Sequence, residues 1–407
     1  MKPVSDVVVV GGGPVGSFTA LNLSRLGAET IVFEEHAEIG VPSHCAGHLS
    51  IRSLRNLKLF PLPKGIVENT FSIANFHSPK GTVFSIHLKH PVTCAVNREL
   101  FDKYLAEKAQ AAGAEYRFNS RVHSLKIDRG AVKGVNVERA GRVESVAGKT
   151  VVDAEGIPSR LLRETDLPGL NRERIVLAVE AEVEKTKTLS TDAVEIFLGR
   201  DYAPGFYAWV IPRLDGTAKV GLAARRGNPE ELLHRLMFKH PVASKLLGQS
   251  RVLKTAFHPI SLGGPISKAY VNGFLAVGDA ASQVKPTTGG GVILGLTCAQ
   301  IAAETVCEAI QLNEFGSGFL MKYQNRFIDK IGFDVSVMLK IRRLLDSLSD
   351  EKIDQALRFC KRISLDKSFE NADEIDFQGK LLLQSLKKPA AAAALAYFLL
   401  LYLSANP

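Results

Sequence analysis

Three observations predict a mixed α/β fold for this chain of 407 residues. Apolar, strand-like segments end in glycine-rich turns near Gly11 and again near Gly278, far apart in the chain. Alternating segments typical of an antiparallel sheet recur between residues 179 and 223, and helical spacing dominates after about residue 313. A strand, a tight turn and a helix in that order are typical of Rossmann-type dinucleotide-binding domains. We therefore expect such a domain, an interleaved antiparallel-sheet domain and a C-terminal helical region.

The first glycine-rich turn follows the apolar run Val7 to Val10. Gly11, Gly13 and Gly16 fit the pattern GxGxxG, and a helical pattern follows them. The next predicted strand ends in Glu34, where a carboxylate can accept hydrogen bonds from the ribose hydroxyls of an adenosine. Because a carboxylate repels a 2'-phosphate, the pattern favours FAD or NAD over NADP.

The second glycine-rich turn separates FAD from NAD. Gly278 and Asp279 follow the apolar run Phe274 to Val277, and Asp279 is well placed to bind a hydroxyl of a ribityl chain. The segment Thr287 to Gly291 then opens a helix, whose positive N-terminal end would lie beside the flavin edge that becomes negative on reduction. NAD needs no such second site, so the two turns together predict FAD.

Further motifs occur in the order found in a known group of enzymes. Asn97-Arg98-Glu99 resembles the start of a helix whose arginine reaches the cofactor, and Asp153 to Arg160 resembles a middle motif that usually reads Asp-Gly where this chain has Glu155-Gly156. From residue 5 to about residue 310, the chain resembles the FAD-dependent oxidoreductases that share the fold of aromatic-ring hydroxylases. The residues that we expect to bind FAD are Gly11, Gly13, Val15, Gly16, Glu34, Ala46, Gly47, Arg98, Val122, Asp279, Gly289, Gly290, Gly291 and Val292.

Two stretches narrow the resemblance. The segment Pro42 to Ser50 fits P-x-x-C-x-G-x-x-S, and Tyr207 to Pro212 is similar to Y-x-W-x-F-P, with Ile211 where phenylalanine is usual. Both motifs resemble those of the geranylgeranyl reductase family, FAD-dependent enzymes that saturate the carbon–carbon double bonds of isoprenoid chains, including those of archaeal membrane phospholipids. The resemblance therefore implies a reductase acting on a prenylated lipid.

The chemistry of that reaction suggests roles for several side chains. Reducing an isolated alkene needs a hydride at one carbon and a proton at the other, and the site must stabilise the positive charge that develops. Tyr207 and Trp209 alternate on a predicted strand, so both rings point to one face, where they can form an apolar, cation-stabilising wall. Cys45 is the candidate for donating the proton or orienting the alkene, because an ordinary thiol is mostly protonated at neutral pH. We expect catalysis from Cys45, Tyr207 and Trp209, and substrate contacts from Tyr207, Trp209, Pro212 and His48. From the residues alone, ordinary core packing stays open as the alternative.

Cysteine usage and charge indicate the setting of the reaction. The five cysteines show no CxxC pair or metal-ligand spacing, so we expect no metal or iron–sulfur centre. Their odd number, without a signal-peptide pattern, predicts a cytoplasmic protein, either free or peripheral at the membrane surface. A soluble donor, namely NADPH, NADH or ferredoxin, would supply electrons. The formal net charge of +9 suits an acidic carrier protein or an anionic lipid headgroup equally, and we expect no nucleic-acid partner.

The predicted domains are discontinuous. We expect an FAD-binding domain over residues 1–70, 95–160 and 265–310, a substrate domain over 71–94 and 161–264, and a helical region over 311–407. The apolar run from Ala390 to Leu403 would form a helix about 21 Å long, short of the roughly 30 Å that a bilayer core requires. It can pack on the protein, close a lipid tunnel or dip into a membrane surface beside Lys387 and Lys388.

Two other functions fit the same fold. A flavin-dependent monooxygenase or epoxidase would bind O2 at the reduced flavin, and a non-catalytic protein would hold FAD and a lipid without turnover. The motif around Cys45 favours the reductase.

Overall fold

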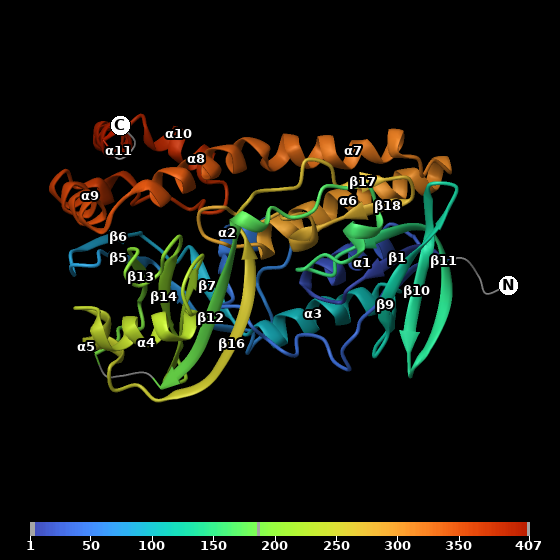
Figure 1. The fold of residues 1–407 in the computed structure, drawn as a ribbon, viewed down its shortest axis with the longest axis horizontal. Coiled ribbons are helices and arrows are strands. Elements are labelled where there is room, and N and C mark those ends of the chain that lie inside the picture. Colours follow the sequence, from blue (N-terminus) through green and yellow to red (C-terminus); the bar gives the residue numbers. More distant parts are fainter. Residues whose placement is uncertain (1–4, 185–187, 405–407) are drawn as a thin grey trace. The chain divides into compact units, whose positions relative to one another are not determined.

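The computed structural model describes residues 5–184 and 188–404, and Figure 1 traces the chain through them. The chain folds into two compact units. The first unit contains the segment that ends at Ser43, together with Arg98–Glu173 and Ser261–Val335, and the second contains His44–Asn97, Arg174–Ile260 and the segment that begins at Ser336. Each unit is therefore built from separate parts of the sequence. Helices and both parallel and antiparallel sheets are present, which confirms the predicted mixed α/β class.

A mostly parallel sheet lies at the centre of the first unit, in the strand order β17-β18-β11-β1-β2-β8. Its neighbours are parallel except for β17 and β18, and the antiparallel hairpin β9-β10 continues from β11 (Figure 1). The strands are β1 Ser5–Val10, β2 Thr30–Phe33, β8 Glu115–Arg117, β9 Arg121–Asp128, β10 Ala131–Arg139, β11 Arg142–Asp153, β17 Tyr270–Val271 and β18 Phe274–Ala276. The run Val7 to Val10 is buried without interruption, as expected for a parallel strand covered on both faces.

Helices cover this sheet. They are α1 Pro14–Arg25, α3 Arg98–Ala111, α6 Val292–Leu312 and α7 Ser317–Phe327, with 3₁₀ turns η1 Leu161–Glu164, η2 Arg172–Arg174 and η3 Gly278–Ala281. A π-helical turn, η4 Ile328–Gly332, joins α7 to α8 Phe333–Ser347. Helix α1 contacts both α3 and α6. Helix α6 is long and apolar enough to cross a membrane. However, 72% of its most apolar stretch is buried inside the protein, which is typical of a core helix.

The second unit contains two sheets. The larger has the order β16-β12-β15-β14-β13-β5-β6, and the smaller has the order β3-β7-β4. Their strands are β3 His48–Ser50, β4 Val67–Phe71, β5 Ile73–His77, β6 Val83–His87, β7 Thr93–Val96, β12 Ile175–Glu184, β13 Ala193–Leu198, β14 Tyr207–Pro212, β15 Thr217–Ala224 and β16 Val252–Ser261. The helices are α2 Ile51–Asn56, α4 Pro229–Lys239, α5 Ala243–Leu247, α9 Asp350–Arg362, α10 Gln378–Ser385 and α11 Pro389–Leu403, with the 3₁₀ turn η5 Leu365–Ser368. The alternating segments expected between residues 179 and 223 are confirmed as strands β12 to β15.

The two faces of the larger sheet differ in character. On one face, alternate residues such as Val179, Ala208 and Val220 join the apolar side chains of α4 and α5 in a closed core. The intervening residues lie on the opposite face, where Tyr207 and Trp209 are only partly buried. The period of two in a strand therefore separates a structural face from a face that carries polar and aromatic groups.

The domain boundaries differ from those expected in three main places. Residues 161–173, expected in the substrate domain, belong to the first unit. Residues 44–70 belong to the second unit, because β3 and β4 both pair with β7. The expected C-terminal helical region is divided, since α7 belongs to the first unit whereas α9, α10 and α11 belong to the second.

The apolar C-terminal run forms α11, which packs by one face. Ala391 and Ala394 are buried in a cluster with side chains of α9 and η5, and the Tyr397 ring stacks on Phe359 at 4.1 Å between centroids. On the other side, Leu400 and Leu403 are 64% and 65% exposed. Helices α10 and α11 meet at a bend of 114°.

A buried histidine in the second unit has a fixed tautomer. The Nδ1 atom of His240 accepts hydrogen bonds from the backbone N–H groups of Val242 and Ala243 at 3.1 and 3.2 Å, so Nε2 carries the proton and donates to the Ser78 carbonyl at 3.0 Å. Burial, with a smaller contribution from the nearby His77, lowers the pKa of His240 from 6.5 to about 4, although the Ser78 bond opposes the shift. The folded chain therefore holds this ring neutral.

We expect the stability of the protein to fall as the pH falls from about 6.5 to about 4. In this window the unfolded chain binds a proton at His240 that the folded chain does not bind, so acid favours unfolding. Urea unfolding at pH 7 and pH 5 measures the effect, and His240→Gln, which keeps an acceptor and a donor, is the matched variant. An equal pH dependence in both proteins would contradict the assignment.

Candidate functional site

The first glycine-rich turn is closed too tightly for side chains at two of its positions. Gly11 has φ +93°, and a Cβ on Gly16 would lie 1.9 Å from the Gly11 carbonyl oxygen. At Gly13, in contrast, a Cβ would meet no atom within 4 Å, and α1 begins at the next residue. The turn therefore presents open space at the positive end of a helix, which is the geometry that accepts a phosphate.

Glu34 lies directly after β2, beside this turn. One carboxylate oxygen accepts the Gly12 backbone N–H at 2.7 Å, and the other lies 2.6 Å from Nδ1 of His36. The side chain is mostly buried, so these contacts fix its position. The structure thus places an oriented carboxylate next to the phosphate-type turn, where the sequence predicts a ribose ligand.

The two glycine-rich turns meet around Val15. A Cβ on Gly278 would lie 2.9 Å from Cγ1 of Val15, and a Cβ on Gly295 would lie 2.6 Å from its Cγ2. Gly278 has φ +66°, which also favours glycine. The valine of the first turn therefore packs where Gly278 of the second turn and Gly295 of α6 lack side chains, so both turns face the same region of the first unit.

The second turn closes in a similar way. A Cβ on Gly291 would lie 2.4 Å from Oδ1 of Asp279, so the carboxylate lies against the start of α6. The Gly289 N–H donates to the Lys285 carbonyl at 2.8 Å, and the Lys285 side chain is buried against Gly290. Sequence reasoning did not single out Lys285. It adds a cation at the helix N-terminus where the flavin edge is expected.

Other predicted cofactor residues have defined places in the first unit. Arg98 begins α3 and forms two hydrogen bonds to Asp102, at 3.0 and 2.9 Å. Burial raises the pKa of Asp102, and Arg98 opposes this. Val122 is buried in β9. Ala46 and Gly47, in contrast, belong to the second unit.

The middle motif lies at the end of β11. Burial raises the pKa of Asp153 well above its usual range, and the neighbouring Glu155 raises it further. Glu155 accepts the Leu161 N–H at 2.8 Å and forms an ion pair with Arg160 at 3.5 Å. The glutamate that replaces the usual aspartate therefore holds the turn that follows it.

Cys45 differs from the other four cysteines in its exposure. It is partly exposed, whereas Cys94, Cys298, Cys307 and Cys360 are buried. Burial raises the pKa of the Cys94 thiol to about 12 and those of Cys307 and Cys360 to about 11. In the folded protein, Cys45 is consequently the thiol best able to meet a ligand or reagent.

The histidines around Cys45 have partners of their own. His44 stacks on His258 with ring centroids 4.2 Å apart. Nε2 of His48 lies 2.7 Å from the Thr93 hydroxyl oxygen, and its ring meets Phe71 edge-on. His48 therefore belongs to the smaller sheet, where it is only partly buried.

Strand β14 brings the predicted aromatic pair together. The Tyr207 and Trp209 rings are 5.9 Å apart at 65°, and the indole N–H donates to Glu180 at 3.3 Å. The indole occupies space above Gly221 on β15, where a Cβ would lie 2.5 Å from its Cζ2. Burial raises the pKa of Tyr207, so its hydroxyl stays protonated. The Pro212 carbonyl accepts the Asn69 amide at 2.9 Å.

Within the second unit, Ala46 of the cysteine motif packs against the aromatic strand. Ala46, Trp209 and Ile211 belong to one apolar cluster with Phe71 and Ala95. The residue that follows Cys45 therefore packs with the residues of the Y-x-W-x-I-P strand. Isoleucine at position 211, where phenylalanine is usual, is buried in this cluster.

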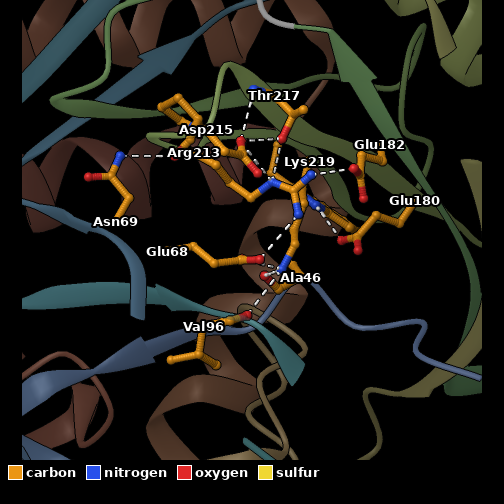
Figure 2. Close-up of polar contacts among 12 residues, drawn as sticks. Ala46, Glu68, Asn69, Val96, Glu180, Glu182, Arg213, Asp215, Thr217 and Lys219 are labelled. Carbon is orange, nitrogen blue, oxygen red and sulfur yellow. Dashed lines mark hydrogen bonds and ion pairs between the residues drawn. The ribbon is translucent and has the colours of Figure 1, made fainter. Parts of the chain in front are cut away.

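A polar network beside this cluster was not foreseen from the sequence. Lys219 on β15, Glu68 on β4 and Arg213, directly after β14, are mostly buried and form ion pairs, as Figure 2 shows. Burial opposes the charge of Arg213, but Glu68, Glu182 and Asp215 outweigh it and raise its pKa. A lysine inside the apolar run Ala218 to Ala223 is the signal that could have revealed the network.

Comparisons with known proteins find a matching family model and similar named proteins. Residues 4–311 match a family model described as an FAD binding domain. The chain is 35% identical to Digeranylgeranylglycerophospholipid reductase 2 of Methanothermobacter thermautotrophicus, covering 87% of this chain and 91% of that protein. It is 32% identical to Digeranylgeranylglycerophospholipid reductase 2 of Methanopyrus kandleri, covering 86% and 88%.

A solved structure also matches. A geranylgeranyl bacteriochlorophyll reductase-like protein from Thermoplasma acidophilum has a TM-score of 0.86 and 25% identity, and the match covers 97% of this chain and 99% of that one. Together with the family model, this match confirms the fold and FAD as the cofactor.

A matched pair of glycine variants tests the cofactor turn. We expect Gly16→Ala to lower both the FAD content and the thermal unfolding midpoint, because the added methyl would overlap the Gly11 carbonyl. Gly13→Ala should lower FAD content alone, because its methyl enters open space in front of α1. Flavin absorbance and unfolding of the apoprotein measure the two effects. Full FAD content in Gly13→Ala would place the phosphates elsewhere.

Proposed function

The chain belongs to the digeranylgeranylglycerophospholipid reductase family of FAD-dependent oxidoreductases, and from this premise we propose that it saturates the double bonds of geranylgeranyl chains in glycerophospholipids or their precursors. The observation that carries the proposal is the packing of Ala46 against Trp209 and Ile211, since it joins the cysteine motif to the aromatic strand. A wall of this kind suits an apolar chain that carries no group to anchor it near the reacting carbons.

The residues of the second unit have separate roles in this proposal. FAD, when bound and reduced, supplies the hydride. Cys45 donates a proton to the other alkene carbon or orients the alkene, and its partial exposure makes both roles accessible. Tyr207 and Trp209 line the substrate path and stabilise developing positive charge with their ring faces. His48 extends the same lining, whereas Pro212 is buried and pairs with Ala218 on the other, closed face of the sheet, so we leave it out of the substrate path.

The residues of the first unit hold the cofactor. Gly11, Gly13 and Gly16 leave room for the phosphates at the start of α1, and Glu34 binds the ribose. At the other turn, Asp279 takes the ribityl chain. The backbone from Gly289 to Val292, with Lys285 beside it, stabilises negative charge on the flavin. Arg98, held by Asp102, adds a further polar contact.

The proposed setting is the cytoplasm, with a peripheral contact to membrane. A soluble donor, NADPH, NADH or an acidic ferredoxin, would reduce the flavin, and the net charge of +9 favours approach of any of these anions. The membrane contact is assigned to α11, where Leu399, Leu400 and Leu403 are 50%, 64% and 65% exposed. Lys387 and Lys388 precede this helix, where their positive charges can attract anionic lipid headgroups.

Anaerobic turnover tests the proposed reaction. The holoprotein is reduced with dithionite and mixed with a geranylgeranylated glycerophospholipid, and flavin reoxidation and lipid mass are followed together. We expect the lipid to gain two hydrogens for each reduced double bond as the flavin returns to its oxidised spectrum. In Cys45→Ser the rate should fall by about 10²-fold or more, the usual size of a general-acid contribution.

Two results would contradict this. A reduced flavin that ignores the lipid and instead inserts oxygen from O2 into a substrate would indicate a monooxygenase. Full activity in Cys45→Ser would remove the proton-donor role while leaving the reductase intact. Cys307→Ala, in α6 of the first unit, is the matched control and should retain its activity.

Vesicle binding tests the assignment of α11. Phosphatidylcholine vesicles that contain phosphatidylglycerol should sediment with the wild-type protein, and the triple change Leu399→Ser, Leu400→Ser and Leu403→Ser should abolish the association. The matched control changes Leu177 and Leu214 to serine, since these are 55% and 70% exposed elsewhere in the second unit. Equal binding by both variants would exclude α11 as the contact.

A further inference from the structure

Lys219 lies on the same sheet face as the aromatic pair. Across the antiparallel strands, Glu182 pairs with Lys219, and Lys219 pairs with Ile211. The neighbouring rung consists of Glu180, Gly221 and Trp209. Directly opposed residues point to the same side of a sheet, so the lysine stem leaves the sheet beside the Trp209 indole.

The ammonium group of Lys219 has three close polar partners. It donates to the Ala46 carbonyl at 3.2 Å and to the Val96 carbonyl at 3.1 Å, and it lies 2.9 Å from Oε2 of Glu68 (Figure 2). The residue is 8% exposed. A buried ammonium with two hydrogen bonds and an ion pair is held in one position.

Glu68 is itself held from the other side. Its Oε1 lies 3.1 Å from Nη1 of Arg213, whose Nη2 lies 2.5 Å from Glu182 (Figure 2). The Nε atom of Arg213 donates to the Thr217 hydroxyl at 2.6 Å. The carboxylate that neutralises the lysine is therefore anchored to β12 and to the β14–β15 connection.

These contacts converge on the loop that carries Cys45. The Val96 N–H donates to the Gly47 carbonyl at 2.9 Å, which ties the loop to β7. Lys219 adds a second tie, because it bridges the Ala46 carbonyl to the Val96 carbonyl. Gly47 has φ +67°, so the loop turns sharply between these two ties.

We propose that Lys219 is a positioning residue for Cys45: by clamping the Ala46 carbonyl to β7 and β15, it sets the thiol relative to the Tyr207 and Trp209 face. Glu68 and Arg213 hold the lysine in place. The role of this clamp in catalysis rests on the function proposed above, but the clamp itself is a structural claim that can be tested without turnover.

The test measures the alkylation rate of Cys45 by iodoacetamide in the FAD-loaded protein, read by peptide mass spectrometry. The four buried cysteines report loss of structure in the same experiment. In Lys219→Met, which keeps the stem and removes the donors, we expect the Cys45 rate to change about threefold or more, because thiol reactivity follows access and surroundings. Lys219→Arg, which restores charge and donors, should return the rate toward wild type.

Steady-state kinetics give the second readout. In Lys219→Met, kcat should fall by about 10- to 100-fold with KM nearly unchanged, because a displacement of about 1 Å at a reacting group costs up to about 10²-fold. The matched control is Arg251→Met, which removes an exposed ion pair with Glu184 beside the same sheet and should change neither readout.

The Lys219→Met change leaves Glu68 without its lysine partner, which can destabilise the folded protein. Alkylation of the buried cysteines would reveal such a loss of structure. In that case the double variant Glu68→Gln, Lys219→Met, which leaves no unpaired carboxylate, is used for the alkylation measurement instead. A wild-type Cys45 alkylation rate in either folded variant would overturn the clamp. An altered rate in a protein that reduces no prenyl lipid would retain the clamp and overturn only the proposed function.

Discussion

Val15 occupies space that two distant glycines leave open, and the cofactor half of the protein depends on this close approach. Any side chain at Gly278 or Gly295 would overlap the valine, so the start of α1 and the second turn could not come together. The sequence between the two turns includes two long segments that leave the first unit. The insertions His44–Asn97 and Arg174–Ile260 form much of the second unit.

Buried charge gives the second unit its specificity. Removing one partner from a buried ion pair typically costs about 3–5 kcal/mol, whereas replacing the whole pair with apolar residues is often neutral. Lys219, Glu68 and Arg213 therefore contribute little net stability that leucines could not supply. Their distinct property is direction, since the two hydrogen bonds from Lys219 to backbone carbonyls hold its ammonium in one orientation. The network therefore fixes the Ala46 and Val96 carbonyls rather than adding stability.

The aromatic strand combines two roles that the sequence alone leaves as alternatives. Trp209 packs with Ile211 and Phe71, as a core residue does, yet it is only partly buried and donates its N–H to Glu180. Ala208, between the two aromatic residues, and Val210, directly after them, are fully buried on the other face. The strand thus separates its structural and chemical residues by alternation, and Gly221 provides the space in which the indole lies.

The sequence by itself determined the features that depend on local geometry. Glycines at positive φ mark turns, strand periodicity places Tyr207 and Trp209 on one face, and an apolar run before Gly11 or Gly278 specifies a strand end. Tertiary structure alone decided that Lys219 meets the Ala46 carbonyl, that residues 44–70 join the second unit and that α11 packs by one face. These contacts join segments far apart in the chain, and their pairing depends on strand order and register, which no local pattern encodes.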